Sequence, residues 1–140
     1  MSVVESKRTE SKLHAAEQAR SLACYTITIT SNENIFLPKY KSALTDKIIA
    51  DSIDIYRMTW EANNIRVRKQ EDAEERFRLQ MKAKSMCNDL LALIGLAKPM
   101  FHLKTKRIEH WARMIIETRE TIVKWHEANV EQYSKQLRGL

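Results

Sequence analysis

The chain has 140 residues, and its 24 lysines and arginines against 18 aspartates and glutamates give a formal net charge of +6. It holds only two glycines and two prolines. That is too few for the turns of a sheet protein, so we expect an all-α fold of a few long helices. No apolar run reaches the roughly 18–20 residues that span a bilayer. The start, MSVVESKRTESK, also lacks the apolar centre of a secretory signal. We therefore expect a cytoplasmic protein with no membrane partner.

The first half of the chain predicts two helices. One runs from about Thr9 to Thr30, although its β-branched end, TITIT, leaves a short strand open as an alternative. The residues SNEN at 31–34 have the chemistry of a turn. The second helix is expected to begin near Pro38, which suits a first helical position, and to end near Asn63.

The second half predicts two more helices, separated from the first pair by the loop RVRKQ. The third begins at position 71 or 72, where acidic side chains complement a helix N-terminus. We expect it to end at Lys98, because Pro99 lacks an N–H and its ring clashes with the preceding turn. Thr105 is the expected N-cap of the fourth helix, which runs beyond Tyr133.

Four helices of about 22–30 residues with short loops predict an antiparallel up-down-up-down four-helix bundle. The prediction is one domain over residues 1–140, with residues 1–8 expected to be flexible.

Two cysteines and three tryptophans have predictable places in such a bundle. Cys24 and Cys87 show no CxxC spacing, and isolated cysteines in a cytoplasmic chain are usually small buried hydrophobic residues. Trp111 lies within the apolar stripe of the fourth helix, so we expect it in the core. Trp60 and Trp125 remain open as rings that stack on nucleic-acid bases.

The positive charge lies entirely in the second half of the chain. Residues 1–65 hold eight basic and eight acidic side chains, whereas residues 66–140 hold sixteen basic and ten acidic ones. Such asymmetry, with a pI near 9.4, favours a nucleic-acid partner. The alternative is a solvated basic surface that only keeps the protein soluble. At one end of the predicted bundle the basic candidates include Arg66, Arg68 and Lys69, diluted by acids at 71–75.

No pattern in the chain predicts catalysis, a cofactor or a metal ion. Phosphate-binding glycine loops, HExxH and Glu-x-x-His are all absent from the sequence. His110 and His126 lie sixteen residues apart on one helix, about 24 Å, so they cannot share a metal ion. We therefore predict a protein that is not an enzyme.

The segment LLALIGLA near the end of the third helix is apolar nearly all round. A bundle helix needs only one apolar stripe, so the surplus is either a thick core or a surface between chains. For a homo-oligomer, the expected interface residues are Leu90, Leu93 and Leu96.

The joint LAKPMFHLKTKRIEHWARMIIETRETIVKW, together with the four-helix layout and the length, resembles one family. It is similar to the accessory variability determinant of diversity-generating retroelements. The resemblance implies a basic, ring-shaped homo-oligomer, typically a pentamer. Its implied partners are the reverse transcriptase, the template RNA and the complementary DNA. Such a protein supports mutagenic complementary-DNA synthesis without catalysing it.

Carried onto this chain, the resemblance makes the basic positions of the matching stretch the expected RNA contacts. They are Lys98, Lys104, Lys106, Arg107 and Arg113. Two other functions stay open: a helical adaptor whose basic face has no nucleic-acid role, and a four-helix protein of the ribosomal-RNA intervening-sequence type.

Overall fold

The computed structural model describes the backbone of residues 3–138 and the side chains of residues 14–136. Within those residues the protein is all-helical, with four long helices and no strand. A 3₁₀ turn, η1, and a π-helical turn, η2, precede the second long helix. The bounds are α1 Val3–Thr30, η1 Pro38–Tyr40, η2 Lys41–Thr45, α2 Asp46–Asn64, α3 Gln70–Phe101 and α4 Thr105–Arg138.

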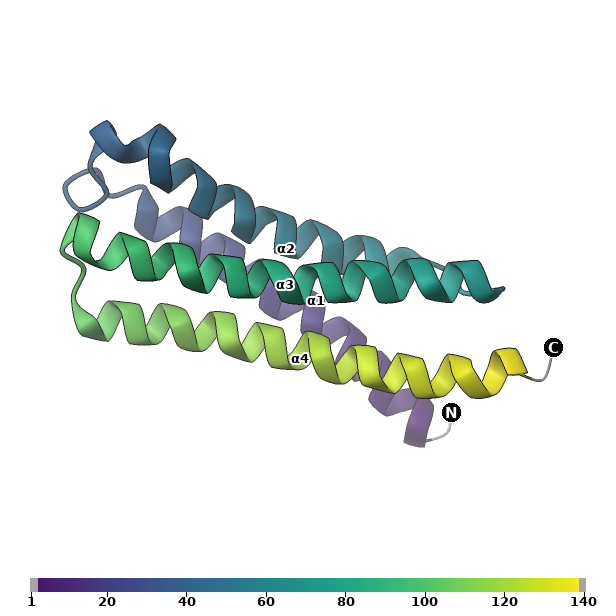
Figure 1. Ribbon diagram of the computed structural model, residues 1–140. Coiled ribbons are helices and arrows are strands. Elements are labelled where there is room, and N and C mark those ends of the chain that lie inside the picture. The colour runs from purple at the N-terminus through teal and green to yellow at the C-terminus, as the bar shows by residue number, and fades with distance from the viewer. Residues whose placement is uncertain (1–2, 139–140) are drawn as a thin grey trace.

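Each long helix packs against the next one in the chain, and α1 also packs against α4 (Figure 1). This packing is compatible with the expected antiparallel up-down-up-down order. In Figure 1 the α2–α3 loop lies at the same end of the molecule as the start of α1 and the end of α4. The α3–α4 joint and the two short turns lie at the opposite end.

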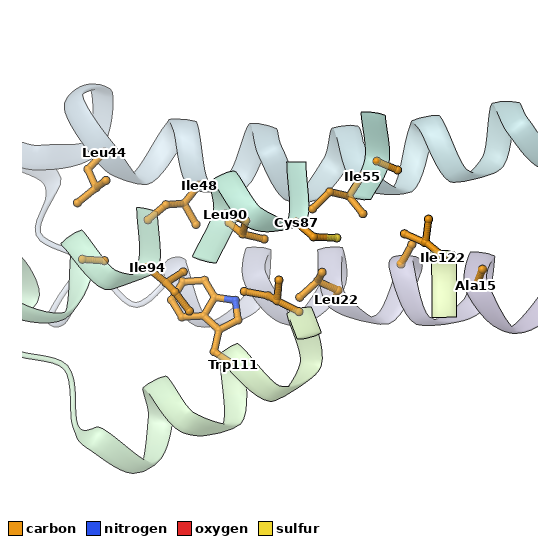
Figure 2. Packing of buried hydrophobic residues seen from close by; sticks show 14 of the residues in the cluster. Ala15, Leu22, Leu44, Ile48, Ile55, Cys87, Leu90, Ile94, Trp111 and Ile122 are labelled. Carbon is orange, nitrogen blue, oxygen red and sulfur yellow. The ribbon is translucent and has the colours of Figure 1, made fainter. Parts of the chain in front are cut away.

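Apolar side chains from all four helices meet in one core (Figure 2). On α4, Trp111, Ile115 and Ile122 recur at helical spacing and are fully buried. The expectation that Trp111 belongs to the core is therefore confirmed. Its indole N–H donates to the Thr26 hydroxyl at 3.1 Å, so no polar atom of this ring is left unpaired. Burying each such side chain stabilises the fold by about 1.5–3 kcal/mol.

The first helix continues through TITIT, so the alternative of a strand there is wrong. Thr26 and Thr30 lie one helical turn apart and are both buried against the rest of the bundle. The Thr30 hydroxyl donates to the Thr26 carbonyl at 2.7 Å, which removes the cost of burying it. The described part of α1 begins at Val3, within the segment 1–8 that we expected to be flexible, and residues 1–2 lie outside the described residues.

The predicted start of the second helix is only partly correct. Pro38 does occupy a first helical position, but of a 3₁₀ turn rather than of α2. The chain then passes through the π-helical turn before α2 begins at Asp46. The turn at 31–34 is confirmed, because the Asn34 N–H donates to the side-chain oxygen of Asn32 at 3.1 Å.

Pro99 does not end the third helix, contrary to our prediction, since α3 runs on to Phe101. The reason lies in tertiary packing. The Phe101 ring lies 5.0 Å from that of Phe36 and 5.9 Å from that of Tyr40. These aromatic contacts offset the roughly 3 kcal/mol that a proline costs within a helix. The helix ends instead at His102, whose backbone is left-handed with φ 52°.

The N-cap of the fourth helix lies one residue earlier in the chain than predicted. The N–H of Arg107 and of Ile108 donate to the Lys104 carbonyl at 3.0 and 3.2 Å. Lys104 is thus the N-cap, and Thr105 occupies the first helical position rather than the cap.

The two cysteines differ in burial. Cys87 lies in the core as expected, but Cys24 is exposed, so the prediction for Cys24 was wrong. Its neighbours Leu22, Ala23 and Thr26 occupy the buried positions of that part of α1, which leaves Cys24 facing outward.

This difference predicts selective thiol chemistry. Burial raises the pKa of the Cys87 thiol to about 12, against the opposing effect of Arg119. Because the thiolate is the nucleophile, a thiol reagent at neutral pH is expected to modify only Cys24 in the native chain. Both thiols should react after unfolding. A Cys24→Ser variant should leave the native chain unreactive, and rapid modification of its Cys87 would contradict the prediction.

Candidate functional site

Five basic residues surround the joint between α3 and α4, and we call them the α4 basic surface. They are Lys98, Lys104, Lys106, Arg107 and Arg113. Four of them are exposed and Arg107 is half-buried. Among the described side chains, none of the five lies within ion-pair distance of a carboxylate. No described carboxylate therefore neutralises any of the five at contact distance, although Glu109, which lies between Lys106 and Arg113 in the sequence, is also exposed.

The backbone adds to this positive charge. The first turn of α4 contains no acidic residue, whereas Lys104, Lys106 and Arg107 all lie at or beside it. Each cation near the partly positive end of a helix costs about 0.3–1 kcal/mol. The same arrangement favours a bound anion, because the free N–H groups and the side chains act together. Lys106 and Arg113 lie two helical turns apart, so they share a face of α4.

Buried anchors hold the joint in place. Phe101 and Leu103 are both buried on either side of the exposed His102. The Leu103 N–H donates to the Lys98 carbonyl at 3.0 Å, which closes the helix end in the manner of a Schellman turn. Lys98 and Lys104 thus project from a fixed turn rather than from a long loop.

The other basic end of the bundle is more nearly neutralised. The Lys69 ammonium lies 3.6 Å from the Glu71 carboxylate. The Asp72 carboxylate accepts the backbone N–H of Arg68 and Lys69 at 3.0 and 3.2 Å, and these hydrogen bonds lower the pKa of Asp72. Arg66 and Arg68 are exposed. Of the predicted contacts at this end, only these two lack a described carboxylate partner.

Two of the three tryptophans are unable to stack on bases. Trp111 is fully buried and Trp125 is 1% exposed, so stacking by either ring is excluded without opening the bundle. Trp60 is 46% exposed on α2, with its ring centroid 6.3 Å from that of Tyr56. Trp60 is the indole ring that remains accessible.

The three leucines predicted at an oligomer interface have different surroundings. Leu90 is completely buried within the bundle core, so its assignment to a surface between chains was wrong. The segment LLALIGLA points Leu90 inward because α3 packs against both α2 and α4. Leu93 is half-buried against the core, and Leu96 is 52% exposed.

Sequence reasoning missed a buried polar network between α3 and α4. The Gln80 amide donates to Asn129 Oδ1 at 3.0 Å, and its oxygen lies 3.0 Å from His126 Nδ1. Arg76 donates to Asn129 Oδ1 at 3.5 Å and to the Tyr133 hydroxyl at 3.0 Å. Arg76 and Gln80 lie four residues apart, as do Asn129 and Tyr133. Polar side chains at core spacing on two helices were the available signal.

A pocket of about 530 Å³ opens beside this network. Its walls come from the end of α2, the following loop, the start of α3 and the last turns of α4. Arg66 and Arg76 line it, together with the amide side chains of Asn63, Asn129 and Gln132. The α2–α3 loop and the last turns of α4, which line the pocket, lie at the end of the bundle opposite the α3–α4 joint (Figure 1).

The network predicts a pH dependence of stability. Burial lowers the pKa of His126 from its ordinary value near 6.5, Glu127 opposes this, and Lys84 adds to it. As the pH falls through that ordinary value, the unfolded chain takes up a proton that the folded chain does not. The free energy of unfolding should therefore decrease between about pH 7.5 and 5.5. Urea unfolding should show a smaller decrease for His126→Gln, and an equal decrease would contradict the assignment.

Metal-binding groups and membrane-spanning helices are two further features that a functional site or a localisation would need. Within the described part of the chain, no three His, Cys, Asp or Glu side chains come together in a group that holds a metal ion. Over the same residues, none of the helices combines the length and apolar character of a bilayer span. Comparisons of the chain with protein-family models, curated proteins and solved structures find no match.

Proposed function

We propose that this protein is a non-catalytic accessory protein that binds nucleic acid through the α4 basic surface. More specifically, we propose a cytoplasmic partner of a diversity-generating retroelement. It binds the reverse transcriptase and the template RNA and supports mutagenic complementary-DNA synthesis. The joint sequence from Lys98 onward supports this proposal by its resemblance to that family, as does the four-helix fold. We propose that the four helices follow the antiparallel up-down-up-down order.

One observation carries the proposal: five cations surround the α3–α4 joint and the first turns of α4, and none of them has a described carboxylate within ion-pair distance. A surface kept only for solubility usually mixes acids and bases evenly, whereas Glu109 is the single acid between Lys98 and Arg113 in the sequence. Here the basic side chains and the N-terminal end of α4 both carry positive charge. Their repulsion lowers the stability of the free protein and favours the binding of phosphate groups. The surface holds no motif for reading bases, so we expect binding that is largely independent of sequence.

The test is the salt dependence of binding to single-stranded RNA. If a protomer neutralises about three phosphates, the slope of log affinity against log salt is about −2 per protomer. Changing Lys104, Lys106 and Arg107 together to glutamine should weaken binding to all sequences alike and flatten this slope. Circular dichroism should remain helical, because Lys104 and Lys106 are exposed and Arg107 is half-buried.

A matched control separates a local surface from net charge. The exposed residues Lys47, Lys82 and Lys124 lie on three different helices, and their change to glutamine removes the same charge. This control variant should bind RNA much more tightly than the α4 variant. If both variants lose the same affinity, the α4 surface is not a defined contact. If the parent protein binds no nucleic acid at low salt, the helical adaptor becomes the better proposal.

We also propose that the protein forms a homo-oligomer, with a pentamer as the expected ring. The exposed Leu96 and half-buried Leu93 on α3 support this, since exposed apolar side chains of one helix offer a contact surface. Light scattering should give a mass several times the 16.4 kDa of one chain. Leu96→Glu should lower that mass without unfolding the bundle. A parent protein of monomer mass at micromolar concentration would reject the oligomer.

A further inference from the structure

We propose that the pocket beside Arg76 binds a phosphate monoester, held by Arg76 from the interior and Arg66 from the α2–α3 loop. This site is separate from the α4 basic surface and stands without the function proposed above. The ligand is a phosphate group with two negative charges, from a free nucleotide-like compound or from the terminal phosphate of an RNA.

Arg76 is the first reason for this proposal. Its side chain is only 5% exposed, yet no described carboxylate lies within ion-pair distance of it. Its terminal nitrogens donate to Asn129, to the Tyr133 hydroxyl and to the Ile65 carbonyl. Its Nε–H is buried without a hydrogen-bond partner, so one donor of the guanidinium group is unsatisfied in a side chain that lines the pocket.

A buried cation without a counter-ion is unfavourable, and two features of the structure reflect that cost. Burial lowers the pKa of Arg76, while Tyr133 opposes this effect. The three partners of the guanidinium are neutral oxygens, which satisfy hydrogen bonds but leave its charge uncompensated. An anion in the pocket would supply the missing charge.

The walls of the pocket favour a doubly charged anion. Two arginines line it, and its other lining residues are neutral amides, Tyr133 and apolar side chains, with no acid among the described ones. A phosphate monoester carries close to two negative charges at pH 7, whereas a backbone phosphodiester or a carboxylate carries one. A guanidinium also presents adjacent N–H groups in a fork that matches two oxygens of one phosphate.

The size of the pocket and one further polar atom fit a ligand larger than inorganic phosphate. A volume of about 530 Å³ falls within the range of small-molecule sites. The side-chain oxygen of Asn63, which also lines the pocket, is buried without a hydrogen-bond partner. A hydroxyl group of the ligand that reached this oxygen would supply its missing donor.

The first experiment follows the Nε–H resonance of Arg76 by NMR during titration with inorganic phosphate and then with a nucleoside monophosphate. Ionic strength is held constant with chloride. We expect this resonance to shift and saturate, with the monophosphate binding more tightly than phosphate alone. No shift with either probe would overturn the proposal, and so would tighter binding of acetate than of phosphate.

A pair of loop variants tests the second arginine without disturbing the interior. Arg66 lines the pocket, whereas Arg68 is exposed on the same loop outside it. Arg66→Gln should weaken binding of the monophosphate about tenfold or more, because it removes a charged hydrogen bond. Arg68→Gln removes the same charge and should weaken binding far less. An equal loss of monophosphate affinity in the two variants would indicate only a general electrostatic attraction and would overturn the proposal.

Two RNAs of one sequence, with a 5′-phosphate or a 5′-hydroxyl, distinguish the sources of the phosphate. Tighter binding of the phosphorylated RNA, lost in Arg66→Gln, would support an RNA end as ligand. Equal binding of the two RNAs, with the monophosphate still shifting Arg76, would support a free compound. Since none of these variants alters the α4 basic surface, failure here leaves the RNA-binding proposal untouched.

Discussion

Replacing Trp111 with alanine is expected to lower the free energy of unfolding by about 3–5 kcal/mol, as for other buried aromatic side chains. The indole is fully buried, and its ring centroid lies 6.2 Å from that of Phe36 and 6.3 Å from that of Tyr25. In Figure 2 it projects into the centre of the core near Ile94. Its removal leaves a cavity and also leaves the buried Thr26 hydroxyl without its donor.

Urea unfolding followed by circular dichroism measures this loss. Trp60→Ala is the matched control, because Trp60 is 46% exposed and its loss opens no cavity. We expect the control to change the free energy of unfolding by less than about 1 kcal/mol. Equal losses for the two variants would contradict the burial of Trp111.

The second prediction with a large effect on stability compares two leucines of the same apolar segment, LLALIGLA. Leu90→Ala is expected to cost about 2–5 kcal/mol, because Leu90 is completely buried and the cavity would lie inside the bundle. Leu96→Ala should change the stability of a single chain by no more than about 0.5 kcal/mol, since Leu96 is 52% exposed.

The measurement must separate folding from association. Urea unfolding at several protein concentrations does this, since only an oligomer has a concentration-dependent midpoint. We expect Leu90→Ala to shift the midpoint at every concentration. If Leu96 contacts a second chain, its effect should grow with concentration. A small effect of Leu90→Ala would contradict its place in the core.

Helical periodicity was enough to predict the four long helices, because a stripe repeating every three to four residues has one interpretation when turn residues are scarce. The ends of helices were harder to predict. Extension of α3 past Pro99 depends on Phe101 meeting Phe36, which lies far away in the sequence. The irregular turns before α2 likewise gave no local signal beyond Pro38.

The basic residues that are candidates for nucleic-acid contacts could be found from the sequence. Which of them form ion pairs with carboxylates could not. The sequence places acids near both basic ends, and only the structure shows that Lys69 has a carboxylate neighbour while Lys104 and Lys106 have none described. The network around Arg76 and Asn129 joins two helices whose relative rotation no single-helix pattern specifies. Buried polar pairs of this kind are visible only after the helices have been packed.

The contact between α1 and α4 has a consequence for how the chain is made. During synthesis α1 leaves the ribosome first, but one side of it has no partner until α4 follows. Leu22 and Ala15 belong to the same core as Ile122 of α4. Until α4 has been synthesised, the first three helices therefore expose apolar surface to solvent. We therefore expect the bundle to close only after α4 has been synthesised. A chain stalled before α4 should be a target for chaperones and proteases.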